Sequence, residues 1–283
     1  MSINVSVTHD VDRIFKSYHY LSKSLTALKK SNFKVINHQF KNLFSKENTY
    51  WNFDDVIAIE ERYNIKATYF FLNESLPLKL FSPKNWVLSQ GRYNIHDKRV
   101  VNIIEELIYR GHEIGVHGSF NSYNNQELLL KEKKTLENIV GKKIIGIRQH
   151  HLNLNENTWE IQNNCGFMYD TSFGFNRNIG FKENRIKPFK PFDNEFIVFP
   201  LVLMDFCFSN TSDKWMKLDS IIQKTIENKG VLVLNWHTDT FNSKEFKHHR
   251  ADFLKILEIL NQLNANFNTL EHFHREYSKI QLA

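Results

Sequence analysis

Cysteine is scarce in this chain of 283 residues, which contains only Cys165 and Cys207. Two cysteines are too few for a disulfide framework, and they lack the CxxC spacing of a redox or zinc-ribbon site. We therefore expect the protein to reside in a reducing compartment, or its fold to be independent of the redox state of the compartment.

Long apolar runs are also missing. No stretch reaches the roughly 18 apolar residues that could span a bilayer, and the N-terminus lacks the basic segment, apolar region and cleavage site of a secretory signal. These absences predict a cytoplasmic protein. There is also no internal repeat and no linker, so we expect a single domain over residues 1–283.

The overall composition is that of a globular protein. Hydrophobic residues make up 41% of the chain and charged residues 24%, so a sizeable core is expected and global disorder is not. The net charge of +6 could attract nucleic acid, anionic lipid or an anionic substrate. Because no nucleic-acid recognition motif accompanies this charge, we do not expect a nucleic-acid binder.

Much of the positive charge lies near the N-terminus. Residues 13–50 carry many lysines and arginines and a single acid, Glu47, while their apolar residues recur at intervals of three and four. This spacing predicts a basic, amphipathic helical insertion. Two interpretations stay open: the helix packs its apolar face on the main domain and solvates its lysines, or it makes a peripheral contact with a membrane surface or a polyanion.

Short apolar segments alternate with segments of helical spacing along the rest of the chain. This alternation is typical of a parallel sheet covered by helices. Seven or eight such units predict an α/β fold, a distorted (β/α)7–8 barrel with an N-terminal helical insertion. The predicted strands cover residues 5–12, 66–72, 113–116, 144–147, 167–170, 196–202 and 231–236, with a possible eighth at 266–269. The predicted helices cover residues 52–64, 98–110, 125–140, 158–163, 215–227 and 246–263.

Polar, titratable residues stand at the ends of five of the seven predicted strands. In parallel α/β folds, ligand-binding and catalytic groups gather at the carboxyl ends of the strands. We therefore expect these side chains to share one rim. They are Asp10 and Asp12 at the end of the first strand, His117 at the end of the third, Arg148 and His150 at the end of the fourth, Asp205 after the sixth and His237 at the end of the seventh.

The two acids of the first strand are close enough to repel each other if both ionise. Such a pair is tolerated where one acid is protonated, where a cation binds, or where both are solvated. A solvated turn remains an alternative from this stretch alone, since aspartate is common in turns.

Five motifs resemble those of the polysaccharide deacetylases, metal-dependent carbohydrate esterases and amidases with a distorted β/α barrel. THDVD is similar to the first motif, in a variant with one residue between the acids. GHEIGVHGSFNS, GIRQHHL, LMD and LNWHTDT resemble the other four in order and spacing. The resemblance spans nearly the whole chain.

The resemblance implies a role for four of these residues in the reaction. Asp10 would be the general base and His237 the general acid. Arg148 would hold the base and line the pocket, and Asp205 would tune a catalytic partner. Asp239, two residues after His237, could orient that imidazole, although we expect a solvated loop acid.

The resemblance also implies a divalent metal, foremost Zn²⁺, bound by Asp12 and His117. The family's second histidine, four residues after His117, is replaced here by Asn121. Asn121 could ligate weakly through its amide oxygen, or His150, where the family more often has proline, could take its place. A catalytic zinc usually has three protein ligands, and imidazole suits zinc better than an amide. We therefore expect His150 as the third ligand.

The sequence thus predicts a hydrolase that removes an acyl group, foremost acetyl, from an amino sugar. Without a secretion signal, the substrate would be a nucleotide-linked or lipid-linked precursor of a surface glycan. Two alternatives remain open: a metal-independent hydrolase of cyclic amides on the same fold, and a catalytically silent barrel that binds glycan, which the missing second histidine motivates. His9 receives no role beyond lining the rim.

Overall fold

The computed structural model describes residues 2–15, 48–74 and 93–280. Most of the predicted helical insertion at 13–50 lies outside these residues, as does part of the predicted loop at 73–97. Within the described part of the chain, every helix is too short or too polar to cross a bilayer.

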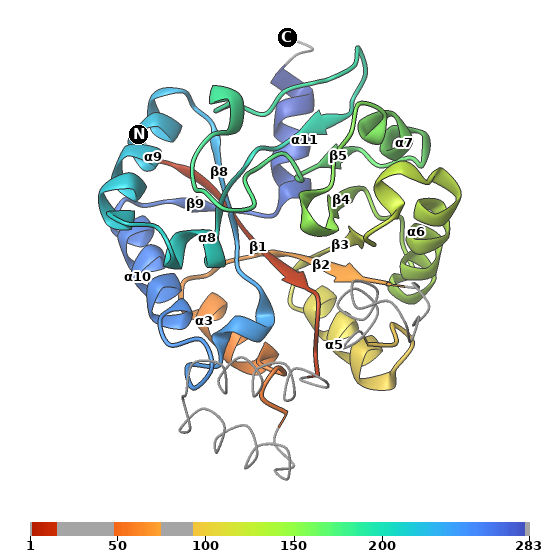
Figure 1. Cartoon of the computed structure of the whole chain (residues 1–283), viewed down its shortest axis with the longest axis horizontal. Helices are drawn as coiled ribbons and strands as arrows, with labels where there is room; N and C mark the ends of the chain where they lie inside the picture. The colour runs from red at the N-terminus through yellow and green to blue at the C-terminus, as the bar shows by residue number, and fades with distance from the viewer. Residues whose placement is uncertain (1, 16–47, 75–92, 281–283) are drawn as a thin grey trace, which may run out of the picture.

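One parallel sheet forms the centre of the molecule (Figure 1). Its strands follow the order β6-β5-β4-β3-β2-β1-β8-β7, and β9 pairs with the start of β1. The strands are β1 (Asn4–Val11), β2 (Thr68–Leu72), β3 (Glu113–Gly118), β4 (Gly146–Gln149), β5 (Tyr169–Asp170), β6 (Ile197–Val198), β7 (Leu201–Met204), β8 (Val231–Asn235) and β9 (Asn266–Phe267).

The two ends of this order, β6 and β7, follow each other directly in the chain. β6 pairs with β5, and β7 pairs with β8, so one bent segment joins the two sides of the sheet. The bend falls at Phe199 and Pro200, and proline has no N–H to donate to a neighbouring strand. The sheet therefore curls into a distorted barrel, which confirms the predicted fold class.

Helices cover the outer face of this barrel (Figure 1). Apolar residues on alternate strand positions face the helices, as the side-chain alternation of a strand requires, and they form the larger core. The helices are α3 (Phe53–Arg62), α5 (Lys98–Tyr109), α6 (Gln126–Val140), α7 (Thr158–Asn164), α8 (Asp205–Ser209), α9 (Lys214–Glu227), α10 (His249–Gln262) and α11 (Leu270–Ile280), with short 3₁₀ segments η1 (Ser122–Asn124), η2 (His150–Leu152), η3 (Lys182–Asn184) and η4 (Thr238–Phe241).

A smaller apolar core fills the inside of the barrel, with Phe70 and Tyr169 among its largest side chains. Both rings lie against glycines of neighbouring strands. A Cβ atom on Gly115 would lie 2.5 Å from the ring of Phe70, and one on Gly146 would lie 2.1 Å from the ring of Tyr169. These glycines make room for the aromatic rings that close the interior.

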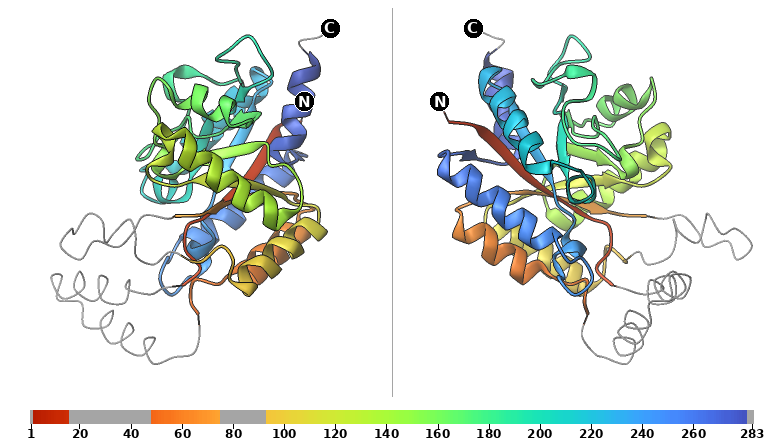
Figure 2. Two further views of the ribbon diagram at one scale, coloured as in Figure 1. Left: turned by 90° about the vertical axis from the view of Figure 1, so that its right-hand side faces the viewer. Right: turned by 60° about the vertical axis from the view of Figure 1, so that its left-hand side comes forward.

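Helix α11 covers the end of the barrel at which the strands begin, and Figure 2 shows it at the same end of the molecule as the N-terminus. Leu270 and Phe273 pack on the interior core. The N–H of Glu271 donates to the buried carboxylate of Glu113 at 2.9 Å. Helix α11 is not among the helices predicted from the sequence, because polar residues make up most of this segment. Helix α11 does not cover the opposite end, where the strands finish, and a functional site is expected there.

Candidate functional site

The carboxyl ends of the strands surround an open pocket of about 540 Å³. Five of the predicted site residues line it, and the other two, Arg148 and Asp205, are fully buried in contact with the lining. The five lining residues are Asp10, Asp12, His117, His150 and His237. The structure thus brings all seven predicted residues together.

Asp10 ends deep in this pocket, where its carboxylate accepts two hydrogen bonds. Nη1 of Arg148 donates to Oδ1 at 2.8 Å, and Nδ2 of Asn235 donates to Oδ2 at 2.7 Å. Burial acts to raise the pKa of Asp10, but the positive charge of Arg148, followed by those of His117 and His237, outweighs it. The pKa of Asp10 therefore lies below its ordinary value, and the side chain is a carboxylate at neutral pH.

Arg148 reaches Asp10 from inside the barrel. Its guanidinium lies 4.6 Å from the ring centre of Phe70 and also donates to Oγ1 of Thr8 at 2.8 Å. A fully buried arginine with fixed donors and an aromatic face beneath it has little freedom to move. Arg148 therefore fixes the position of the Asp10 carboxylate as well as its charge.

His237 stands on the other side of Asp10, after β8. Its Nδ1 lies 2.9 Å from Oδ1 of Asp205, and its Nε2 lies 4.0 Å from Oδ2 of Asp10. Asp205 also accepts from the main-chain N–H of His237 at 2.9 Å and from Oγ1 of Thr240 at 2.9 Å. Burial alone would lower the pKa of His237, but the charge and hydrogen bond of Asp205 raise it to about 10. The imidazole is therefore protonated at neutral pH.

Asp12, His117 and His150 form a compact group beside Asp10. Nε2 of His117 lies 3.0 Å from Oδ1 of Asp12, and Nε2 of His150 lies 3.4 Å from Oδ2 of Asp12. One potential ligand atom from each residue lies within 4.8 Å of the others. In a tetrahedral zinc site with bonds near 2.1 Å, neighbouring ligand atoms are about 3.4 Å apart. The nitrogen and oxygen donors of this group therefore fit a small divalent cation.

The second nitrogen of His117 supports the same interpretation. Nδ1 lies 2.9 Å from the main-chain oxygen of Arg148, so it carries the proton and donates. Nε2 is then the nitrogen that faces the acids. A histidine that donates from one nitrogen to a carbonyl and presents the other to a cation is the usual arrangement in metal sites.

His150, and not Asn121, completes this group. Asn121 is exposed at the start of η1 and does not line the pocket. The chain turns sharply after His150, because His151 and Leu152 both have positive φ, 57° and 52°. Two consecutive non-glycine residues in this conformation are strained, which is often found at functional sites.

Two of the sequence predictions are wrong. His9 does not line the rim: it is fully buried on the outer face of β1, because residues 9 and 10 of a strand point to opposite faces. Its Nε2 lies 3.0 Å from Oε1 of Glu60. Asp239 is not solvated but buried, and burial raises its pKa to about 6 against the charge of His237. Asp205, rather than Asp239, holds the imidazole of His237.

Asn235 is the contact to Asp10 that the sequence analysis missed. It is the one polar residue in the apolar run of β8, and its full burial explains why it must be hydrogen-bonded. A single polar residue inside an otherwise apolar strand is the feature of the sequence that could have identified this contact.

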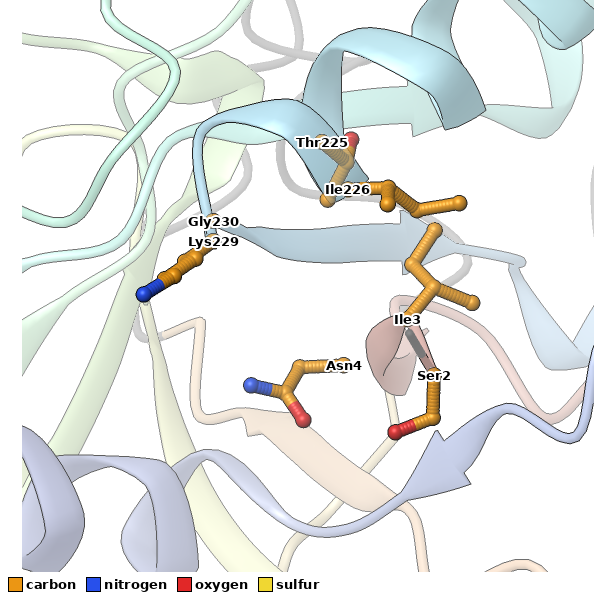
Figure 3. Close-up of a pocket in the computed structure, with 7 residues that line it drawn as sticks. All are labelled: Ser2, Ile3, Asn4, Thr225, Ile226, Lys229 and Gly230. Carbon is orange, nitrogen blue, oxygen red and sulfur yellow. The ribbon is translucent and has the colours of Figure 1, made fainter.

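A second hollow of about 360 Å³ lies at the opposite end of the barrel, between the starts of β1 and β8 (Figure 3). Its lining contains one charged side chain, Lys229, and neither an acid nor a histidine. It therefore lacks the carboxylates and imidazoles that the pocket around Asp10 offers for metal binding.

Comparisons with known proteins bear on the family and the fold of the chain. The family model described as WbmS-like polysaccharide deacetylase matches residues 93–251. None of the curated proteins compared with the chain matches it.

Two solved structures show the same fold. A probable polysaccharide deacetylase from Pseudomonas aeruginosa PAO1 is 13% identical, with a TM-score of 0.61 over 98% of this chain and 91% of the other. An allantoinase is 14% identical, with a TM-score of 0.59 over 97% of this chain and 90% of the other. At such identities the similarity concerns the fold alone.

Proposed function

Because the chain belongs to the polysaccharide deacetylase family, we propose that it hydrolyses an N-acyl group, foremost N-acetyl, on an amino sugar of a surface-glycan precursor or polysaccharide. One observation carries the proposal. A carboxylate held ionised, an imidazole held protonated and a group of three metal-ligand side chains line a single pocket. Together these groups meet the demands of amide hydrolysis, in which water must be activated and the amine must leave protonated.

Asp12, His117 and His150 would hold the metal, foremost Zn²⁺. When bound, such an ion lowers the pKa of a coordinated water to about 7 and stabilises negative charge on a polarised carbonyl oxygen. One carboxylate and two imidazoles would supply three protein ligands, the number that a catalytic zinc site usually has.

Asp10 would act as the general base. Its Oδ1 is held by Arg148 and its Oδ2 by Asn235, but each carboxylate oxygen has two lone pairs. A lone pair therefore remains to accept a proton from the attacking water. The low pKa of Asp10 keeps it ionised, and Arg148 prevents it from turning away from the pocket.

His237 would act as the general acid and deliver the proton from Nε2 to the leaving amine. Asp205 accepts from Nδ1 of His237, which fixes the ring so that Nε2 faces the pocket. This carboxylate also stabilises the imidazolium before transfer, as the orienting acid of a catalytic histidine does.

The carrier and the cellular location of the substrate remain predictions from the sequence. We propose a nucleotide-linked or lipid-linked sugar handled in the cytoplasm, with residues 1–283 acting as one domain and residues 13–50 in contact with the membrane. The cluster of lysines and arginines in that segment is what supports the contact.

Acetate release tests the proposed function. The zinc-loaded protein should release acetate from N-acetylglucosamine oligosaccharides or from UDP-N-acetylglucosamine. Chelation with EDTA should stop the release and added zinc should restore it. Asp10→Asn should lower the rate by about 10²- to 10⁴-fold, the usual contribution of a general base. Hydrolysis that survives the loss of metal would favour the cyclic-amide alternative, and glycan binding without turnover would favour a silent barrel.

A further inference from the structure

Two arginines in the pocket make no ion pair with any residue that the structure describes. Arg13 and Arg177 both line it. The carboxylates that line it are Asp10 and Asp12, and both are engaged elsewhere. Asp10 pairs with Arg148 at 2.8 Å, and Asp12 lies against the histidines of the proposed metal group. The acids that line the pocket therefore form no ion pair with either arginine.

Arg13 follows Asp12 directly and is half-buried. Its Nε is buried, and the described residues provide no hydrogen-bond acceptor for it. Asp239 is close enough to sense the charge of Arg13, yet the two form no ion pair within 4.0 Å. A buried guanidinium N–H without an acceptor is unfavourable, and a ligand oxygen in the pocket would satisfy it.

Arg177 stands at the rim on the segment after β5. The preceding residue, Asn176, donates from Nδ2 to the main-chain oxygen of His151 at 2.8 Å. This bond ties the segment of Arg177 to the residue after His150. Both arginines therefore line the same pocket as the proposed metal group.

On the basis of the proposed function, we propose that the substrate is an amino sugar with an anionic group, a carboxylate or a phosphate, and that Arg13 and Arg177 bind this group. The planar guanidinium offers paired N–H donors that match the oxygens of both anions. A neutral sugar would offer these arginines no charged partner, whereas an anionic sugar would. Charge attraction in a pocket of this kind also raises the local concentration of the substrate.

Binding of deacylated sugars tests this inference without turnover. The probes are glucosamine, glucosamine 1-phosphate and galactosaminuronate, titrated calorimetrically into the zinc-loaded full-length protein. We expect at least one anionic sugar to bind about tenfold more tightly than glucosamine, as a charge-assisted hydrogen bond provides. Whichever of glucosamine 1-phosphate and galactosaminuronate binds more tightly shows whether phosphate or carboxylate is the recognised group.

Arg13→Gln and Arg177→Gln should each remove most of this preference. Lys142→Gln is the matched control, because it removes one positive charge from an exposed position away from the pocket. It should retain the preference. Since Arg177 is exposed, its variant is expected to fold and carries the test if Arg13→Gln does not.

Equal binding of the three sugars to the wild-type protein would overturn the inference, as would an unchanged preference in the arginine variants. Acetate release is measured separately. A preference for anionic sugars without acetate release from any N-acetyl sugar would contradict the proposed function and leave the anion site standing. Acetate release without this preference would contradict the anion site and leave the proposed function standing.

Discussion

Oδ2 of Asp12 lies 3.4 Å from Nε2 of His150, while Oδ1 of the same carboxylate lies 3.0 Å from Nε2 of His117. The aspartate thus contacts one histidine through each oxygen. His150 follows β4 and faces Asp12, whereas Asn121, four residues after His117, is exposed. This geometry leads to the first prediction, that His150 and not Asn121 controls metal affinity.

We expect His150→Ala to weaken zinc binding by more than about 100-fold, because loss of a ligand costs at least as much as loss of a residue that supports one. Asn121→Ala is the matched control and should bind zinc like the wild-type protein. Zinc content after dialysis and competition with a chelator measure both affinities. If Asn121→Ala loses the metal and His150→Ala keeps it, the ligand set is wrong.

The positions of these site residues could be predicted because each stands near the carboxyl end of a strand whose apolar run is visible in the sequence. Asp10, His117 and His237 all lie where such a run stops. The orientation of a neighbouring side chain is harder to predict, as His9 shows. Residues at the end of a strand alternate between the two faces, and a one-residue error in register moves a side chain from the pocket to the outer core.

The second prediction concerns Asp205, which raises the pKa of His237 to about 10. His237 must be protonated to act as the general acid, so activity should fall as the pH rises through the pKa of His237. In Asp205→Asn the charge is lost, and the pKa of His237 should fall toward its ordinary value of about 6.5. The alkaline limb of the kcat/KM profile should therefore move to lower pH.

Asparagine preserves an acceptor oxygen for Nδ1 of His237, so the ring can keep its orientation in this variant. The control is Asp213→Asn, which removes an exposed acid just before α9. Its alkaline limb should coincide with that of the wild-type protein. An alkaline limb that stays in place in Asp205→Asn would mean that another group limits the rate at high pH.

The third prediction concerns the buried pair of His9 and Glu60. Both side chains are fully buried, and Nδ1 of His9 lies 2.7 Å from the main-chain oxygen of Trp236. His9→Phe leaves the Glu60 carboxyl with one partner fewer inside the core. We expect a loss of about 1–3 kcal/mol in the free energy of unfolding, the cost of a buried polar group left unsatisfied.

His272→Phe is the control for this substitution. His272 makes the same type of contact with Glu276 at 3.2 Å, but on the surface of α11. Exposed pairs contribute little, so we expect a change of less than about 0.5 kcal/mol. Urea denaturation measures both variants. Equal effects would mean that burial does not determine the contribution of the His9 pair.

Much of the fold also follows from local signals. Helix α6 begins after Asn125, whose side chain accepts from the N–H of Leu128, and ends at Gly141 with φ of 72°. Both residues are typical for these positions. The attachment of α11 follows from no local signal, because it depends on Glu113, which lies 158 positions away from its partner Glu271. Contacts between such distant residues appear only when the barrel is assembled.

The last prediction concerns this buried carboxyl. Burial raises the pKa of Glu113 from 4.5 to about 7, although hydrogen bonds from Tyr169 and from the N–H of Glu271 act to lower it. Between these two values the folded protein binds a proton that the unfolded chain has released. The free energy of unfolding should therefore fall as the pH rises from about 4.5 to about 7, by on the order of 3 kcal/mol from this group.

Glu113→Gln removes this titration, so its free energy of unfolding should vary less between pH 5 and pH 8, as measured by urea denaturation. Some pH dependence should remain, because burial also raises the pKa of Glu132 to about 7. Glu105→Gln, at an exposed position of α5, should keep the pH dependence of the wild-type protein. If Glu113→Gln also keeps it, the hydrogen bonds that Thr68, Tyr169 and the N–H of Glu271 donate hold the Glu113 carboxylate ionised in the folded protein. In that case α11 is attached to the barrel by a charge rather than by a neutral acid.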